Sequence, residues 1–493
     1  MTSTSPTTSR HAPDWLILSI ACVAQFMVVL DVSIVNVALP HMGHDLGMSQ
    51  TKAQWVINAY VLTFAGFLLL GGRAADLFGR RKVYLLGTAV FTLSSVAAGF
   101  AHTGTQMIVA RAVQGLGGAI LSPATLTIIV TTFSGARLPK AIGAWSAVAG
   151  AGGAVGGLAG GLLTGLASWR WCFFVNVPFG IAATTVATLY LQERRSREAT
   201  VKLDVTGALL VTAGLTALIY GVVNTTTSSW TSSSTLSWLI GAAVLLIGFI
   251  LWEARVASHP LVAFRIFQSR PLTVANIVMV LAGGAFFAMW FFLTYYFQNV
   301  LGYGAVRTGF AFLPMAVAII IGAQLSSRLL VKTGVRPLLL VGAAFATLGF
   351  FWLSLISTTS AYWSDLFAPG FLCSFAMGLL FAPLATAATA NVDRADAGLA
   401  SGVLNTARQV GGSLSLAILG TVAFDRTRAL LAGRGARLLR VAEVGGYVRA
   451  FEISAVITLV AFFVALALPA KVGHHSSHAP QGDPAAAAAA AGH

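Results

Sequence analysis

The sequence predicts an all-α membrane protein built from 14 transmembrane helices. Of its 493 residues, 57% are apolar and 9% are charged, whereas about 25% of the residues in an ordinary soluble domain are charged. So few charges cannot cover the surface of a soluble fold of this size. A spanning helix needs about 20 mostly apolar residues, so the apolar residues suffice for at most about 14 spans. This composition excludes a soluble enzyme, a disordered chain and a disulfide scaffold.

Apolar runs long enough to cross a bilayer follow one another with short polar connections between them. The first run is too long for the apolar part of a signal peptide, and no small-residue cleavage site follows it. An even number of spans places both termini on the same side of the membrane. We expect spans at residues 15–39, 54–72, 83–101, 106–131, 139–165, 171–191, 204–223, 236–254, 272–297, 308–328, 337–357, 364–389, 400–424 and 450–469.

Basic residues near the span ends predict the orientation, because cytoplasmic loops carry an excess of Lys and Arg. With the N-terminus inside, 19 of these residues lie inside and 9 lie outside. The preference for Arg over Lys, together with abundant Gly and Ala, is typical of a GC-rich bacterial genome. We therefore expect a bacterial plasma-membrane protein with both termini in the cytoplasm.

One loop, spanning residues 426–449, runs against this rule. It holds six of the nine outer basic residues, which are Arg426, Arg428, Arg434, Arg437, Arg440 and Arg449. Two interpretations stay open, a short surface helix or a rim that attracts substrate. Because the basic residues elsewhere form only short scattered clusters, we expect no nucleic-acid partner.

Sequence motifs for ATP-driven or enzymatic chemistry are absent. The chain has no GxxxxGK[ST] phosphate loop, no GxGxxG before a helix, no HExxH and no GxSxG. We therefore expect no enzymatic activity, no cofactor and no metal. If the protein moves a solute uphill, an ion gradient supplies the energy.

Asp31 is the one acid well inside a span. A carboxylate in hydrocarbon costs roughly 3 kcal/mol even on the lenient insertion scale. It must therefore be protonated, paired or exposed to water. Asp31 is either half of a fixed ion pair between two helices or a site that binds and releases a proton.

Arg111 is the matching basic residue. Asp31 lies eight residues before Leu39 and Arg111 lies six residues after Thr105, so both are about 9–12 Å from the outer ends of their spans. Gln114 shares the helix face of Arg111. Our hypothesis is that Asp31 is protonated without substrate and loses its proton when substrate binds, with Arg111 favouring the charged form.

The fifth span has two tracks of glycines spaced four residues apart. One track is Gly152, Gly156 and Gly160, and the other runs from Gly153 through Gly157 to Gly161. Small residues at this spacing let helix backbones touch. The tracks predict either tight packing alone or a sliding contact between two halves of the protein.

A basic loop between the second and third spans is the most distinctive connection. It contains Gly72, Arg73, Asp76, Gly79, Arg80 and Arg81. The spacing of Arg73, Asp76, Gly79 and Arg81 recurs 255 residues later in segment 328–336, with Val331 in place of the acid. A duplicated helical half is the expected sequence trace of many transporter folds. The loop is either a topology signal or a charge latch that holds one conformation.

Aromatic and amide groups inside the spans are candidates for a drug-sized pocket, although most aromatic residues in helical bundles simply pack or lie at the interface. The candidates are Tyr60, Gln114, Trp145, Phe287, Trp290, Tyr295, Phe375 and Asn405.

Several of these segments together resemble the Major Facilitator Superfamily, in its fourteen-span drug:proton antiporter branch. The resemblance covers about residues 15–469. It rests on residues 30–40, on the loop from Gly72 to Lys82, on Arg111 with Gln114 and Gly115, and on segments 168–178, 296–303 and 401–405. One departure is Gly156-Gly157, where the antiporter motif of the branch has Gly-Pro.

This resemblance implies two six-helix halves around a central cavity, with two extra helices between them. It divides the chain into a cytoplasmic N-terminus (1–14), an N-terminal half (15–191), the inserted helices (192–271), a C-terminal half (272–469) and a disordered cytoplasmic tail (470–493). The implied activity is export of hydrophobic or cationic drugs against inward proton flow, by a monomer in the lipid bilayer. Because the later spans hold no second buried acid, we expect neutral or monocationic substrates.

Two alternatives to drug export stay open. One is a dedicated exporter of a single endogenous metabolite that uses the same mechanism. The other is a membrane sensor or scaffold that does not transport, although an intact Asp31 and Arg111 argue against it.

Overall fold

The computed structural model describes residues 13–134, 137–191, 203–390, 392, 396–432 and 438–469. The regular structure of these residues is helical throughout, with no strand among them. The predicted tail 470–493 and most of the predicted N-terminal segment 1–14 lie outside the described residues.

The helices fall into three sets along the chain. The first comprises α1 (Asp14–Asp45), α2 (Gln50–Phe78), α3 (Arg80–Gly99), α4 (Gly104–Thr132), α5 (Arg137–Leu166), α6 (Trp171–Phe174) and α7 (Asn176–Tyr190). The second is the pair α8 (Val205–Asn224) and α9 (Ser233–Arg255). The third comprises η1 (Phe264–Gln268), α10 (Arg270–Tyr295), η2 (Tyr296–Val300), α11 (Ala305–Thr333), α12 (Val335–Leu353), η3 (Tyr362–Leu366), α13 (Phe367–Thr389), α14 (Ala397–Leu431) and α15 (Leu439–Leu466).

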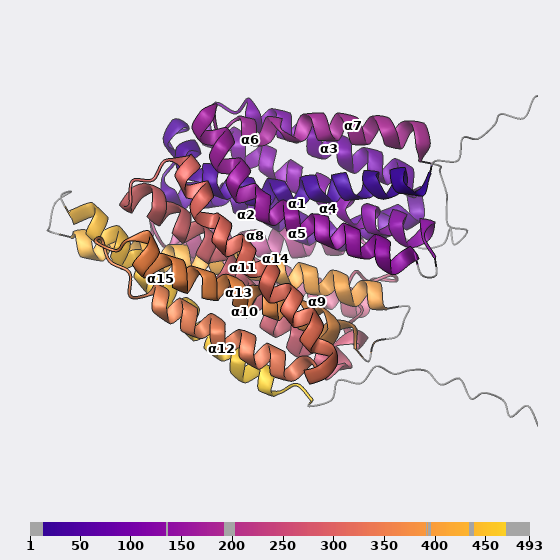
Figure 1. Ribbon diagram of the computed structural model, residues 1–493. Helices are drawn as coiled ribbons and strands as arrows, with labels where there is room; N and C mark the ends of the chain where they lie inside the picture. Colours follow the sequence, from indigo (N-terminus) through magenta and orange to yellow (C-terminus); the bar gives the residue numbers. More distant parts are fainter. Residues whose placement is uncertain are drawn as a thin grey trace, which may run out of the picture.

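The first and third sets form two bundles that lie side by side (Figure 1). Helices α1 to α7 pack mainly on one another, as do α10 to α15. Contact between the bundles runs chiefly through two seams, α5 against α11 and α2 against α14. We call the side of the molecule where α1 begins the near side and the opposite side the far side.

Twelve helices in the described part of the chain are long and apolar enough to cross a membrane. Helices α5 and α14 are further long helices that do not join this set. Helix α14 has 35 residues and includes Arg408, Asp425, Arg426 and Arg428, which lower its mean hydropathy. The predicted all-helical fold is confirmed. The predicted count of 14 spans requires that α5 and α14 also cross the membrane, and these two helices are not among the twelve.

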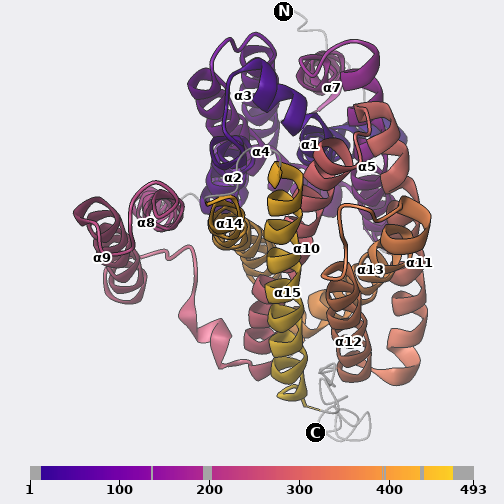
Figure 2. The same cartoon turned by 90° about the vertical axis from the view of Figure 1, so that its left-hand side faces the viewer.

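Helices α8 and α9 lie at one edge of the molecule (Figure 2). Helix α8 packs on α2 and α14, and α9 packs on α8. Only 11% of the most apolar 18-residue stretch of α9 is buried. The pair therefore covers the α2–α14 seam from outside and leaves the α5–α11 seam uncovered.

The connection predicted for residues 72–82 is much shorter than expected. Helix α2 continues to Phe78 and α3 begins at Arg80, so Gly79 alone breaks the helix. Its φ of 95° is a conformation that favours glycine. The repeat of this segment has the same device, since Gly334, with φ of 79°, alone separates α11 from α12. The two copies therefore share a backbone geometry as well as a residue spacing.

The two glycine tracks of α5 face different helices. Added Cβ atoms at Gly156 and Gly160 would lie 2.4 Å from Ser33 and 2.5 Å from the Ile34 carbonyl, both on α1. An added Cβ at Gly161 would instead lie 2.5 Å from the Ala305 carbonyl on α11. Gly152 belongs to the α1 track, where an added Cβ would lie 3.2 Å from the Phe26 carbonyl. The first track thus joins two helices of the same bundle, whereas Gly157 and Gly161 of the second track close a seam between the bundles on the far side.

Gly161 is therefore the position at which a single methyl group tests the seam. In Gly161→Ala the new carbon meets backbone atoms that cannot rotate away, so we expect a loss of stability of about 1–3 kcal/mol. Gly153→Ala is the matched control, because its Cβ would meet nothing closer than 3.9 Å. Thermal unfolding of the purified variants should give a clearly lower midpoint for Gly161→Ala alone. Equal midpoints would contradict the tight seam.

Candidate functional site

Asp31 lies in the middle of α1 and has no exposed surface. Its Oδ2 atom accepts a hydrogen bond from Nη1 of Arg111 at 2.5 Å. Its Oδ1 atom accepts from Nε2 of Gln114 at 2.8 Å and from Nδ2 of Asn176 at 3.0 Å. Three donors therefore surround the carboxyl group.

Arg111 is almost as deeply buried as Asp31, with 1% of its surface exposed. Besides Asp31, its guanidinium donates to the Gln114 side chain at 2.6 Å and, through Nε, to the Val56 carbonyl at 3.1 Å. The guanidinium also lies 4.2 Å from the ring centre of Tyr60. An aromatic face stabilises a desolvated cation, so α2 contributes both a carbonyl and a ring to hold the charge.

Two residues that the sequence did not assign to the site complete it. Ser95 on α3 accepts hydrogen bonds from Gln114 at 3.0 Å and from Asn176 at 2.9 Å, and donates to the Phe173 carbonyl. Asn176 begins α7 and is fully buried. The only sequence signal for either residue is that Asn176 belongs to one of the segments that resemble the antiporter branch.

The network draws its side chains from α1, α3, α4 and α7 and is supported by α2, all within the first bundle. A proton on Oδ2 of Asp31 would take the place of the Arg111 hydrogen bond, so the proton and the guanidinium compete for one oxygen. Because the pair is fully enclosed, the proton can exchange with water only after the helices around it shift.

The residues predicted to line a pocket do not form one set. Tyr60 and Gln114 belong to the Asp31 network. Tyr295 is 5% exposed and packs on Phe291, with ring centres 4.8 Å apart. It is therefore a core residue of the second bundle and not part of an open pocket.

Two further aromatic residues pack within their own bundles. The indole of Trp145 on α5 donates to Oγ1 of Thr125 on α4 at 3.0 Å. The ring of Phe375 on α13 packs on Phe345 of α12, with centres 6.1 Å apart. These rings meet neighbours within their own bundles, because sequence spacing does not specify which neighbouring helix an aromatic side chain will meet.

The remaining three pocket candidates lie on α10 and α14. Trp290 packs on Phe312 of α11, with ring centres 4.7 Å apart. Phe287 lies against Gly412 of α14, where an added Cβ would be 3.1 Å from its ring. Asn405 lies two helical turns before Gly412 on α14 and is half-buried. All three residues therefore lie on or against α11 and α14, the helices that meet the first bundle.

The segment predicted as a conformational switch lies on the near side, between α2 and α3. Gly72 approaches Pro123 of α4, and an added Cβ would lie 3.5 Å from that ring. Nη2 of Arg81 donates to the Thr188 carbonyl near the end of α7 at 2.7 Å. Arg73 is half-buried, while the side chain of Asp76 lies outside the described residues. The charge latch therefore stays a prediction.

The outer arginine segment consists largely of extended helix ends. Helix α14 carries Arg426 and Arg428, α15 carries Arg440 and Arg449, and the two helices project as a hairpin on the far side (Figure 1). Arg434 and Arg437 lie outside the described residues. No separate surface helix is present among the described residues of this segment.

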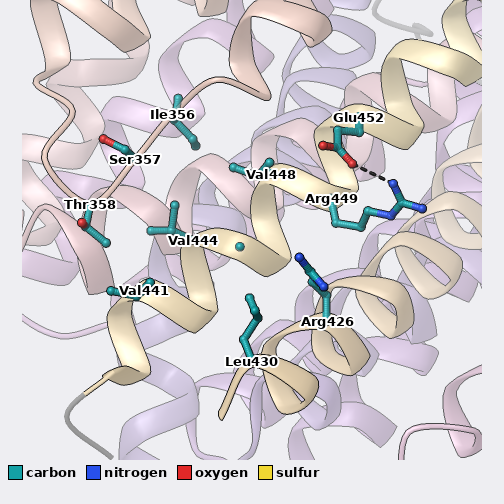
Figure 3. Close-up of a pocket in the computed structure, with 11 residues that line it drawn as sticks. Ile356, Ser357, Thr358, Arg426, Leu430, Val441, Val444, Val448, Arg449 and Glu452 are labelled. Carbon is teal, nitrogen blue, oxygen red and sulfur yellow. Dashed lines mark hydrogen bonds and ion pairs between the residues drawn. The ribbon is translucent and has the colours of Figure 1, made fainter. Parts of the chain in front are cut away.

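A hollow of about 640 Å³ lies beside this hairpin (Figure 3). Arg426 points toward it, and Arg449 is held by Glu452 at 2.8 Å. Its other walls are mostly apolar and include Leu430, Val444 and Val448. The hollow shares no residue with the Asp31 network.

The cost of separating the buried charges can be measured directly. Asp31→Asn keeps the size of the side chain but leaves Arg111 without an opposite charge. We expect it to lower the free energy of unfolding by about 3–5 kcal/mol. Asp31→Asn combined with Arg111→Gln removes both charges and should be more stable than Asp31→Asn alone. Thermal unfolding of the three proteins checks this order, and a double variant no more stable than the single one would refute the pairing.

Comparison with known proteins agrees with this architecture. The sequence profile of the Major Facilitator Superfamily matches residues 21–416. The chain is 42% identical to the cephamycin export protein of Amycolatopsis lactamdurans, over 84% of this chain and 86% of that protein. It is 39% identical to the puromycin resistance protein of Streptomyces alboniger, over 89% of this chain and 87% of that protein.

Solved structures share the fold at low sequence identity. A bacterial homologue of the human lysosomal transporter Spinster, in its inward-facing and unoccupied conformation, matches with a TM-score of 0.64 and 15% identity, over 94% of this chain and 98% of that one. A D-xylose–proton symporter matches with a TM-score of 0.62 and 13% identity, over 93% of this chain and 99% of that one. The profile match and the identity to the two export and resistance proteins show that this chain belongs to the Major Facilitator Superfamily.

Proposed function

We propose that the protein exports antibiotics or similar drug-like amphiphiles by proton antiport. The observation that carries this proposal is the enclosed Asp31–Arg111 pair, a carboxyl group whose proton and whose cationic partner compete for one oxygen. The names of the cephamycin export protein and the puromycin resistance protein support the substrate class. An intact buried carboxyl group of this kind argues for ion-coupled transport over a scaffold role.

The proposed cycle uses the competition at Asp31. With Asp31 protonated, Arg111 loses its ion-pair partner and the helices of the first bundle are free to rearrange. When substrate binds, Asp31 releases its proton and Arg111 restores the closed network. In this cycle one proton is exchanged for each change of conformation. The substrate drives the change because it binds the two conformations with different affinities.

We further propose the topology that this cycle needs. The chain crosses the membrane 14 times, with α5 and α14 included, and both termini and the near side face the cytoplasm. Residues 15–191 and 272–469 act as the two moving halves, residues 192–271 supply the inserted helix pair, and the transporter works as a monomer. The clustering of basic residues near the expected inner span ends supports this orientation.

A second candidate is dedicated export of one compound by the same mechanism. The relatives at 42% and 39% identity are each named for a single antibiotic. A transporter of this kind would move one compound strongly and related amphiphiles weakly.

Proton movement in liposomes that contain the purified protein tests both candidates. An imposed pH gradient drives the exchange, and an internal pH-sensitive dye reports it. We expect added antibiotics to produce proton flux, Asp31→Asn to reduce that flux at least tenfold, and Glu452→Gln to leave it unchanged. Glu452 is a suitable control because it is an exposed carboxylate on the far side.

The outcomes separate the candidates. Flux with many unrelated compounds supports multidrug export, and flux with one compound supports the dedicated exporter. Flux that survives Asp31→Asn would keep the transporter but remove Asp31 as its coupling site. No flux with any compound would contradict the proposed function.

A further inference from the structure

Arg408 is a charged residue in the interior of a long helix. It is the twelfth residue of α14, about 17 Å along the axis from Ala397. The nearest acids on either side in the described part of this helix region are Asp396 and Asp425, 12 and 17 residues away. A charge at such a depth is costly and is normally paired or turned toward water.

The contacts of α14 show which way each of its faces points. Gly411 and Ser415 touch α10, since their partners are Val280 and Gly284. Gly402 and Gly420 touch α2, where their partners are Leu69 and Gln54. The hydroxyl of Thr421 donates to the Val222 carbonyl of α8. Helix α14 therefore meets α10, α2 and α8 along three separate lines.

Arg408 lies on a fourth line, between the α10 and α2 contacts and away from α8. At 3.6 residues per turn, Ser401, Asn405, Arg408 and Gly412 share this face. Ser401 and Arg408 are exposed, Asn405 is half-buried and Gly412 is buried against Phe287. The accessible stripe thus begins at the near side and ends close to the middle of the helix.

The side chain of Arg408 is exposed and lies against two helices of the second bundle. An added Cβ at Gly283 of α10 would lie 3.5 Å from its Cγ. Its guanidinium carbon lies 5.9 Å from the ring centre of Phe381 on α13. Because Arg408 lies between α10 and α13 and is still accessible, it opens toward the space between the bundles.

Arg408 has no hydrogen bond or ion pair with any described residue, and neither has the side chain of Asn405. Helix α10 has no acidic residue, and neither has α13. Arg111 is different, because Asp31, Gln114 and Val56 saturate most of its donors. Among the described residues, Arg408 is therefore a cation far from the helix ends whose guanidinium is free to bind a ligand.

We propose that Arg408 recognises the anionic group of the transported compound. The substrate class is an amphiphilic anion, an apolar or aromatic compound that carries one carboxylate or a similar oxyanion. The guanidinium binds the oxyanion through two parallel hydrogen bonds. Asn405 lies one turn away as a second donor, and Phe287 and Phe381 supply apolar surface on either side.

This inference rests on the proposed export function and changes its expected selectivity. The sequence alone favoured neutral or monocationic compounds because the later spans lack a second acid. An unpaired cation on the accessible face of α14 repels a positive ligand and attracts a negative one. We therefore expect anions to bind more tightly than cations of the same shape.

Three fluorophores that share a dansyl group test this expectation by direct binding. Dansylglycine carries a carboxylate, dansylamide is neutral and dansylcadaverine carries an ammonium group. Each is titrated into the full-length protein in nanodiscs of zwitterionic lipid, with empty nanodiscs as the background. The variants are Arg408→Gln, Arg408→Lys and the control Arg328→Gln, which removes an exposed arginine near the end of α11.

We expect dansylglycine to bind most tightly to the parent protein and about 10- to 100-fold more weakly to Arg408→Gln. Arg408→Lys should recover part of the loss, since it keeps the charge without the planar pair of donors. Dansylamide should change little in either variant, and Arg328→Gln should match the parent protein.

Equal loss of all three probes in Arg408→Gln would show a structural role and overturn the proposal. Unchanged dansylglycine binding would overturn it as well, as would tighter binding of dansylcadaverine than dansylglycine to the parent protein. Because binding is measured without a proton gradient, these results do not require proton antiport. Failure of proton antiport in liposomes would therefore be distinguishable from failure of anion recognition.

Discussion

The buried ion pair between Asp31 and Arg111 is the interaction on which the first bundle depends. Neither charge can be moved from water into the bilayer interior alone without a penalty of several kcal/mol. The fold meets that penalty with an ion pair, two amide side chains, a serine hydroxyl, a backbone carbonyl and the face of Tyr60. Five helices, α1 to α4 and α7, therefore have to be in register for the charges to be satisfied.

In the proposed cycle this requirement makes the pair a switch as well as a support. A network that is satisfied only in one arrangement resists small displacements, because losing one partner leaves another buried polar group unpaired. A proton is the smallest ligand that relieves the constraint, since it neutralises Asp31 and removes the need for Arg111 at Oδ2. In that cycle, coupling between proton and conformation would follow from electrostatics within one bundle.

The two bundles are joined in a different way, through backbone contact. Gly161 and Gly309 let α5 and α11 touch on the far side, where an added Cβ on either glycine would collide with the other helix. Such a contact contains few side chains and no ion pair among the described residues, so it can separate without stranding a charge. The α2–α14 seam carries the inserted pair α8–α9 on its outer edge, which leaves α5–α11 as the freer of the two seams.

Much of this architecture was predictable from the sequence, because membrane helices are long apolar runs and charges inside them are rare. The shared depth predicted for Asp31 and Arg111 came from counting residues, and the structure places the two in contact. Asn176 and Ser95 were not predicted as site residues, because a buried amide or hydroxyl has no periodicity that separates it from an ordinary polar residue. The extension of α2 to Phe78 was missed because basic residues signal the end of a span but do not end a helix. The roles of Phe375 and Tyr295 depended on which neighbour each ring meets, and that is fixed only by tertiary packing.

Proton release on drug binding measures directly whether Asp31 gives up its proton when the compound binds. Calorimetric titration of the purified protein with a transported compound, repeated in buffers of different ionisation enthalpy, counts the protons released per compound bound. We expect close to one proton for the parent protein and none for Asp31→Asn. Release that persists in Asp31→Asn, or binding to the parent protein without any release, would contradict it.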